Sequence, residues 1–145
     1  LGATGILSGT PTTAGDYTFT VQAADAASRT ATQSLGVTVA GGAASQIFWL
    51  GQPANLRRNE PIRPGPIVRV QDGAGNLVTT PIAVTMSITR PSNASFTGSS
   101  ITTVTTVGGT ATFENLRIDD RSNSTRITAS AGSIRSPESE NFRVQ

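Results

Sequence analysis

The sequence predicts an all-β protein built of β-sandwiches. Three observations support this prediction. Apolar and polar residues alternate with a period of two in several segments. Turn-forming residues recur roughly every 8–12 positions, a spacing typical of sandwiches. The chain is rich in turn formers, with 15 Gly and 8 Pro in 145 residues, and no window has the periodicity of an amphipathic helix.

The first alternating segment predicts an antiparallel hairpin near the N-terminus. A short strand is expected around residues 6–7, and a corner at residues 14–16. Two strands then follow, over residues 17–23 and 32–39, joined by a turn at residues 25–28. Their apolar side chains all point to one face, which we expect to need a covering partner: Tyr17, Phe19, Val21, Leu35, Val37 and Val39.

Small residues at positions 41–44 predict a linker between two domains, residues 1–40 and residues 45–145. Beyond the linker the alternation resumes and Asp72 to Asn76 form a turn. The strands expected there are residues 47–49, 68–70, 82–88, 101–107, 111–113, 116–118, 127–129 and 142–144. This is enough for one complete sandwich.

The first strand of the second domain leaves two alternatives open. If Ile47 and Trp49 point inward, Phe48 and Leu50 point outward directly after the linker. These two could pack against the preceding module. The alternative is a first strand that changes sheets and buries both of its faces.

The residues that the chain lacks argue against catalysis. There is no Cys and no His, and all 11 basic residues are Arg. A Ser nucleophile therefore has no usual base, and Schiff-base chemistry is impossible. A pair among the nine carboxylates could still act on a glycoside, but sugar clefts usually need aromatic platforms, and the only Trp and Tyr fall at inward positions. We predict that the protein is not an enzyme.

Calcium is the one cofactor that the sequence leaves open. The densest oxygen cluster is Asp119, Asp120 and Asn123, and it is the candidate metal site. Asp25 and Asp72 lie in turns of a suitable type. The alternative for all of them is a structural turn, in which Asx side chains accept hydrogen bonds from their own backbone.

Four arginines lie close together in the second domain: Arg57, Arg58, Arg63 and Arg69. They could face a polyanion such as an anionic glycan. The alternative is a solvated edge whose charges discourage strand-to-strand aggregation. The net charge is only +2, so nothing indicates a nucleic-acid partner, and no apolar run is long enough to span a membrane.

The second domain resembles the invasin/intimin type of bacterial Ig-like domain. The matching residues are Gln52-Pro53, Val68-x-Val70-x-Asp72-Gly73-x-Gly75-Asn76, Val84-x-Met86, Gly109-x-Ala111-x-Phe113-x-x-Leu116-x-Ile118 and Ile127-x-Ala129-Ser130. These are turn and core positions, so the resemblance implies a fold and no active site.

The first domain resembles the closing part of the Ig-like repeats related to cadherin-like domains. The run from Ala3 to Val21, with Leu7-Ser8-Gly9-Thr10-Pro11 and Ala14-Gly15-x-Tyr17 inside it, carries the resemblance. In that family roughly as much chain again precedes the motif, so we expect Leu1 to be a cut end and the first strands to lie outside this sequence.

The Gly15-Asp16-Tyr17 corner also has the pattern of a tyrosine corner, in which the Tyr hydroxyl bonds back to upstream backbone. In the second domain the corresponding position is Thr125, so we expect another contact to fix that crossing.

Both resemblances imply tandem modules of secreted and surface-attached bacterial proteins. We therefore predict a non-catalytic spacer or adhesion module, extracellular or at the cell surface. Its expected partners are neighbouring Ig-like modules or other copies of the chain, with a surface glycan or host protein as further candidates. Two alternatives are an accessory domain of a large exported enzyme and a subunit of a self-assembling filament.

Overall fold

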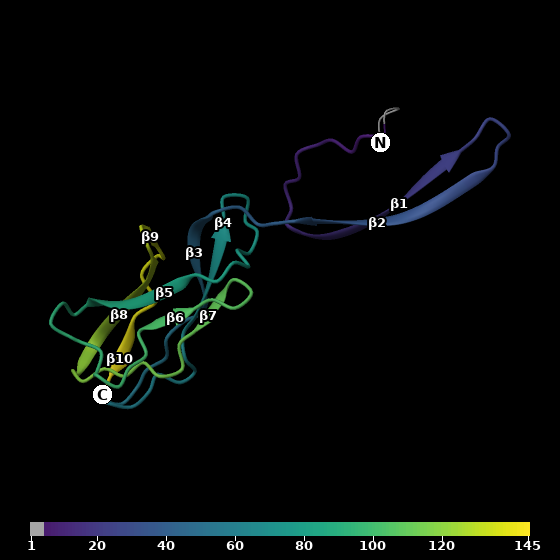
Figure 1. Cartoon of the computed structure of the whole chain (residues 1–145). Coiled ribbons are helices and arrows are strands. Elements are labelled where there is room, and N and C mark those ends of the chain that lie inside the picture. Colours follow the sequence, from purple (N-terminus) through teal and green to yellow (C-terminus); the bar gives the residue numbers. More distant parts are fainter. Residues whose placement is uncertain (1–4) are drawn as a thin grey trace. The chain divides into compact units, whose positions relative to one another are not determined.

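The computed structural model describes residues 5–145, which fold entirely as β-structure in antiparallel sheets (Figure 1). Ala3 and Thr4 of the N-terminal motif lie outside the described residues. The chain divides into two compact units, Leu1–Gly41 and Gly42–Gln145. No helix in the described part is long and apolar enough to cross a membrane. The predicted all-β fold class is confirmed.

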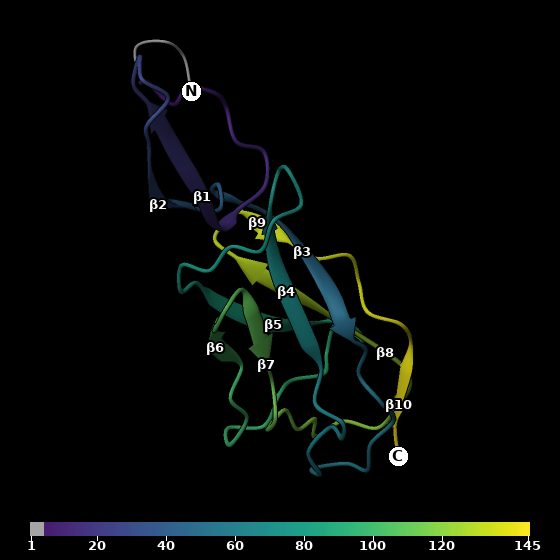
Figure 2. The same ribbon diagram turned by 90° about the vertical axis from the view of Figure 1, so that its right-hand side faces the viewer.

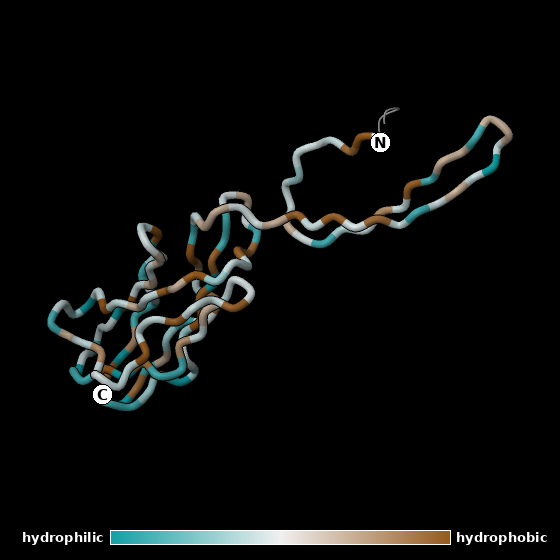
Figure 3. The backbone as a smooth tube through the Cα atoms, in the orientation of Figure 1, coloured by the Kyte–Doolittle hydropathy of each residue, from teal (hydrophilic) through white to brown (hydrophobic). Residues whose placement is uncertain are grey.

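Unit 1 is one hairpin of β1 (Gly15–Ala24) and β2 (Thr30–Val39). Tyr17 pairs with Val37 and Phe19 with Leu35, so the predicted apolar residues share one face. Figure 3 shows the resulting alternation of hydrophobic and hydrophilic residues along both strands. The short strand expected around residues 6–7 is wrong, because Gly5, Gly9 and Pro11 hold residues 5–14 in an irregular course.

A tyrosine corner fixes the start of β1, as the sequence predicts. The Tyr17 hydroxyl donates a hydrogen bond to the carbonyl of Thr13 at 3.0 Å. Gly15 has φ of 151°, a conformation that side-chain-bearing residues rarely adopt. A Cβ there would lie 3.6 Å from the Tyr17 ring. Gly15 therefore supplies the backbone bend over which the ring lies.

Unit 2 is a sandwich of two sheets (Figure 2). One sheet has the order β3–β4–β7 and the other the order β10–β8–β5–β6, with β9 paired to β8. The strands of the first sheet are β3 (Ala44–Gly51), β4 (Ile67–Asp72) and β7 (Thr110–Thr112). Those of the second are β5 (Ala83–Arg90), β6 (Thr103–Thr105), β8 (Ser122–Ala131), β9 (Ile134–Arg135) and β10 (Phe142–Val144).

The core of unit 2 consists of the inward side chains of both sheets. Its fully buried members include Ile47, Val68, Val70, Val84, Phe113, Leu116, Ile118, Ile127 and Phe142. The alternation of apolar and polar residues in the sequence predicts that these side chains point inward. At about 25 cal/mol per Å² of buried apolar surface, this cluster is the main source of the stability of unit 2.

Residues 116–118 form no continuous strand, contrary to the sequence prediction. Arg117 makes a single bridge to Pro61 and Ile118 a single bridge to Phe96, so adjacent residues pair with different segments. Pro61 itself donates no N–H, although Asn59 N donates to Ile118 O and Ile62 N to Leu116 O, both at 2.9 Å. The strand expected at residues 101–107 shortens to β6.

Two buried serines extend the pairing of β8 beyond β9. The backbone N–H of Ile127 donates to Ser139 Oγ at 3.1 Å, and that of Ala129 donates to Ser136 Oγ at 3.0 Å. In return, the N–H groups of the two serines donate to the carbonyls of the same two residues. The irregular segment before β10 is thereby held on β8 with its backbone groups satisfied.

The first and last segments of unit 2 are joined by polar contacts. After Gly51 the chain leaves β3 and pairs with the other sheet, where Leu56 forms a parallel bridge to Val144. The N–H of Leu56 donates to Arg143 O, and that of Gln145 donates to Leu56 O, both at 3.0 Å. Asn55 Oδ1 accepts from Arg143 N at 2.7 Å.

Two further contacts join the same segments. Gln52 Oε1 accepts from Glu140 N at 3.0 Å, and Trp49 Nε1 donates to Pro137 O at 2.9 Å. Together with the pairing of Leu56 they fix the crossing for which a tyrosine corner is absent, as expected. Thr125 itself is fully buried and paired with Phe142, and its hydroxyl has no hydrogen-bond partner.

Asp72 fixes the start of unit 2. Its Oδ2 accepts from the N–H of Gly42 at 2.8 Å, and its Oδ1 accepts from the N–H groups of Ala74 and Asn76 at 2.9 Å. These bonds, led by the one from Gly42, lower the pKa of Asp72 from 3.8 to about 2. One carboxylate thus holds both the 72–76 turn and the residue at which unit 2 begins.

Substituting Gly65→Ala should destabilise unit 2. A Cβ at position 65 would lie 2.3 Å from the carbonyl oxygen of Phe113, which is backbone and cannot rotate away. We expect a loss of about 1–3 kcal/mol in the free energy of unfolding, measured by urea denaturation. Gly98→Ala is the control, since nothing lies within 4 Å of its Cβ position, and it should change stability by less than about 0.5 kcal/mol. Equal stability of the two variants would contradict the packing described.

Substituting Asp72→Asn should remove a pH-dependent part of the stability. The pKa of Asp72 is lowered on folding, so its stabilisation is present above about pH 4 and is lost as the pH falls through about 2. Melting temperatures measured between pH 2 and 7 should therefore show wild type well above Asp72→Asn at pH 7. The difference should shrink steadily below pH 4, and a constant difference would argue against the carboxylate contacts.

Candidate interaction surfaces

The apolar face of the hairpin is the candidate interaction surface that the sequence predicts in unit 1. Tyr17, Leu35 and Val37 are 43%, 45% and 41% exposed. Phe19, Val21 and Val39 are partly buried by their neighbours. Within the described part of unit 1 the hairpin is a two-stranded sheet with no second sheet against it. The covering partner that the sequence predicts for this face stays a prediction.

The other face of the hairpin is mainly polar. Thr18, Thr20, Gln22, Thr32 and Ser34 lie on it. Asp16 also lies there, and its Oδ1 accepts from the Thr38 hydroxyl at 2.6 Å. By contrast, no residue on the apolar face carries a charge. The hairpin is therefore an amphipathic sheet whose apolar side is suited to packing against another apolar sheet.

The N-terminal segment borders part of the apolar face. Leu7 and Pro11 line a shallow depression together with Val37 and Val39. Leu7 is itself 58% exposed. The N-terminal segment therefore lies beside the apolar face and does not cover it.

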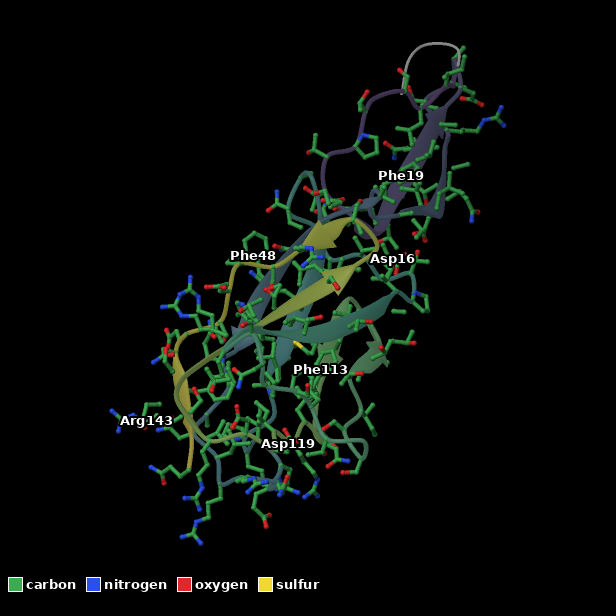
Figure 4. The ribbon with its side chains drawn as sticks, turned by 90° about the vertical axis from the view of Figure 1, so that its left-hand side faces the viewer. Asp16, Phe19, Phe48, Phe113, Asp119 and Arg143 are labelled. Atoms are coloured by element: carbon green, nitrogen blue, oxygen red, sulfur yellow. The ribbon has the colours of Figure 1, made fainter. Side chains whose placement is uncertain are left out.

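Phe48 and Leu50 form a second apolar surface, on the outer side of β3. They are 38% and 60% exposed (Figure 4 labels Phe48). Ile47 is buried, and Trp49 packs against the core, as predicted. The first segment does change sheets, but only after Gly51. The change therefore leaves Phe48 and Leu50 outward and does not bury both faces of the strand.

The oxygen cluster Asp119, Asp120 and Asn123 lies where the connection from Ile118 enters β8. Asp120 Oδ2 accepts from the side-chain amide of Asn93 at 3.2 Å. The carbonyl of Asp119 accepts from Arg58 Nε. Asp119 and Asn123 are exposed. Among residues 5–145, no group of three or more His, Cys, Asp or Glu could hold a metal ion. The calcium site stays a prediction.

Asp25 closes the hairpin turn as an Asx turn. Its Oδ1 accepts from the N–H of Ala27 at 2.9 Å and of Arg29 at 3.0 Å, and its Oδ2 accepts from Arg29 Nε at 2.7 Å. Hydrogen bonds from Arg29, first that of its backbone, lower the pKa of Asp25. The oxygens considered for calcium here are engaged by their own turn, as are those of Asp72.

The four arginines grouped by the sequence are divided among different environments. Arg58 lies against the end of the chain, with its N–H donating to Gln145 O at 2.7 Å, and Arg57 precedes it. Arg69 lies in β4, paired with Phe48 of β3. Sequence reasoning missed three other arginines, Arg117, Arg121 and Arg143, because they are far from Arg58 in sequence and only the sandwich topology brings their segments near it.

Comparison with known families agrees with this architecture for the first unit. A family model described as Putative Ig domain matches residues 1–40, the segment that contains the tyrosine corner and the hairpin. No curated protein matches the chain, and no catalytic family was found. Residues 1–40 of the chain are thus similar to an Ig-like domain family, and the chain continues as all-β structure to Gln145.

Proposed function

We propose that this chain is a spacer and adhesion module of a larger secreted or cell-surface bacterial protein, and that it is non-catalytic. The Ig-like match supports a structural module, since domains of this family are typical of extracellular and surface proteins. The framework residues Gln52-Pro53 and Asp72 to Asn76 support the invasin/intimin type for unit 2. A single structural observation supports the mechanical part of the proposal.

That observation is the connection between the first and last segments of unit 2. The chain enters unit 2 at the end near the 72–76 turn and leaves it at the opposite end (Figures 1 and 2). The parallel pairing of Leu56 with Val144 lies between these points. A pull on the two ends would drag the paired segments past each other, so several hydrogen bonds would have to break together.

Substituting Asn55→Ala should lower the force at which unit 2 unfolds. This change removes the side-chain acceptor for Arg143 N, one of the bonds between the first and last segments. The full chain would be pulled by its two ends in single-molecule force spectroscopy at one loading rate. We expect a lower peak for unit 2 in the variant and little change in its melting temperature.

Asn115→Ala is the matched control for this experiment. It also removes contacts of an Asn side chain, those of Asn115 Nδ2 with Ser99 O at 2.8 Å and of Asn115 Oδ1 with Arg117 Nε at 2.9 Å, but these contacts join neither terminal segment. Its unfolding force should equal that of wild type. If both variants lowered the force equally, the mechanical argument would fail.

Self-assembly is a second candidate function, favoured by the open face of the hairpin. That face bears no charge, so two copies of the chain could oppose their apolar faces without repulsion between like charges. Two stacked hairpins would make a small sandwich of the kind that a lone hairpin cannot form.

Substituting Leu35→Glu should abolish such assembly. Light scattering should show a mass that rises with concentration for wild type and a constant monomer mass for Leu35→Glu, because a buried unpaired carboxylate is costly. Ser34→Glu adds the same charge to the opposite face and should behave as wild type. A wild-type chain that stays monomeric at all concentrations would rule out self-assembly.

A further inference from the structure

Most arginines of unit 2 have no acidic partner. Unit 2 contains ten Arg and seven Asp or Glu residues, a net charge of +3, and every charged side chain lies among the described residues. The ion pairs of unit 2 are those of Arg90 and Arg126 with Glu138. Eight arginines therefore have no carboxylate within 4.0 Å.

Five of the eight are carried by segments that meet at the end of unit 2 where β10 finishes. Arg58 bonds to Gln145 and to the carbonyl of Asp119. Arg143 lies in β10, and its carbonyl accepts from Leu56 N. Figure 4 shows that Arg143 extends outward at the same end as Asp119. We call this surface the arginine end: Arg57, Arg58, Arg117, Arg121 and Arg143.

Two of these arginines are held in place by backbone and amide oxygens. Arg58 donates through Nε to Asp119 O. Arg117 donates through Nε to Asn115 Oδ1 at 2.9 Å and through one terminal nitrogen to Asn59 O at 2.8 Å. A guanidinium has five N–H donors, so each retains donors for a ligand while its position is already fixed.

The other three arginines are available in full. The side chains of Arg57, Arg121 and Arg143 are exposed, with no ion pair or side-chain hydrogen bond in the structure. Arg121 lines a polar depression with Ser122, Asn123 and Gln145, whose side chains add neutral donors beside the charge.

Three carboxylates lie among these segments, and they leave the surface positive. Glu60 and Asp119 are exposed, and Asp120 accepts a hydrogen bond from Asn93. Against five arginines they leave a net charge of about +2 over one end of a small domain, where the positive potential would attract a polyanion.

We propose that the arginine end binds an acidic polysaccharide through its sulfate or carboxylate groups. Arginine forks match both groups in geometry. The contributing segments offer no exposed aromatic ring on which bases could stack: Phe142 and Phe113 are buried, and Phe96 packs against the core. A polymer whose charges lie on its outside therefore suits this surface better than a nucleic acid does.

This inference goes beyond the proposed function and is tested separately from it. A spacer needs no ligand, so the module could resist force without binding a glycan, and the reverse also holds. Binding at this end would give the module an adhesive surface of its own.

The experiment measures binding of the full chain to dextran sulfate, to polygalacturonate and to neutral dextran, in 50 mM NaCl and again in 300 mM. We expect the two acidic polymers to bind, dextran not to bind, and salt to weaken binding at least tenfold. The variant Arg121→Gln/Arg143→Gln should bind roughly fivefold more weakly, as expected for the loss of two exposed ion pairs.

The matched control is Arg69→Gln/Arg135→Gln, which removes the same charge from β4 and β9, outside the arginine end. It should bind like wild type. Equal loss in both variants would show that only net charge matters and would overturn the site. Absence of binding to either acidic polymer, or tighter binding of a thymidine oligonucleotide of equal charge, would overturn the ligand class.

Discussion

A β-sheet with one apolar face must place that face against another apolar layer, and this constraint determines the construction of both units. In unit 2 the two sheets meet each other, so Val68, Val84 and Ile127 are removed from water completely. In unit 1 the same kind of face exists, with Tyr17 beside Val37 and Phe19 beside Leu35, but the described chain provides no opposing sheet there. A two-stranded hairpin in water is at best marginally stable. The two units therefore differ in completeness and not in the type of sheet from which they are built.

In unit 2 the first segment of the chain contributes to both sheets. It leaves the first sheet after Gly51, where β3 ends, and crosses to β10 of the second sheet. The crossing runs through irregular backbone, whose polar groups need partners. Side chains supply some of them: the oxygens of Gln52 and Asn55 accept N–H groups of the last segment. In unit 1 the Tyr17 hydroxyl has a comparable role at the Thr13 carbonyl. In both units a polar side-chain atom forms a hydrogen bond with a backbone N–H or C=O group where a strand begins or where the chain crosses between sheets. The residue types that supply this atom differ.

The sequence predicts those features of the structure that depend on local interactions. The hairpin, its apolar face, the tyrosine corner and the Asp72 turn depend on residues close in sequence, and all were predicted correctly. The inward positions of the second domain were also correct, since a period of two assigns each side chain to a face. Residues 116–118 were wrong because their neighbours Pro61 and Phe96 come from elsewhere in the chain. The arginine end could not be predicted either, since Arg58, Arg121 and Arg143 are brought together by long-range pairing of Val144, with Leu56 on one side and with Ser122 on the other.

The same pairing explains why one end of unit 2 is suited to contacts while the interior is not. The core cluster between the sheets is apolar, and the hydroxyl of Thr125 is a buried side-chain oxygen without a hydrogen-bond partner. At the end of β10, however, three connections converge, and polar loops must occupy the surface there because their backbone cannot be buried unpaired. Arginine is the only base in this chain, so any positive charge at that end has to be a guanidinium. Unlike a compact ammonium group, a guanidinium can bond to a carbonyl of its own fold and still present donors outward, as Arg58 and Arg117 do. The groups that fix the loops at this end are therefore also groups that can bind an anion.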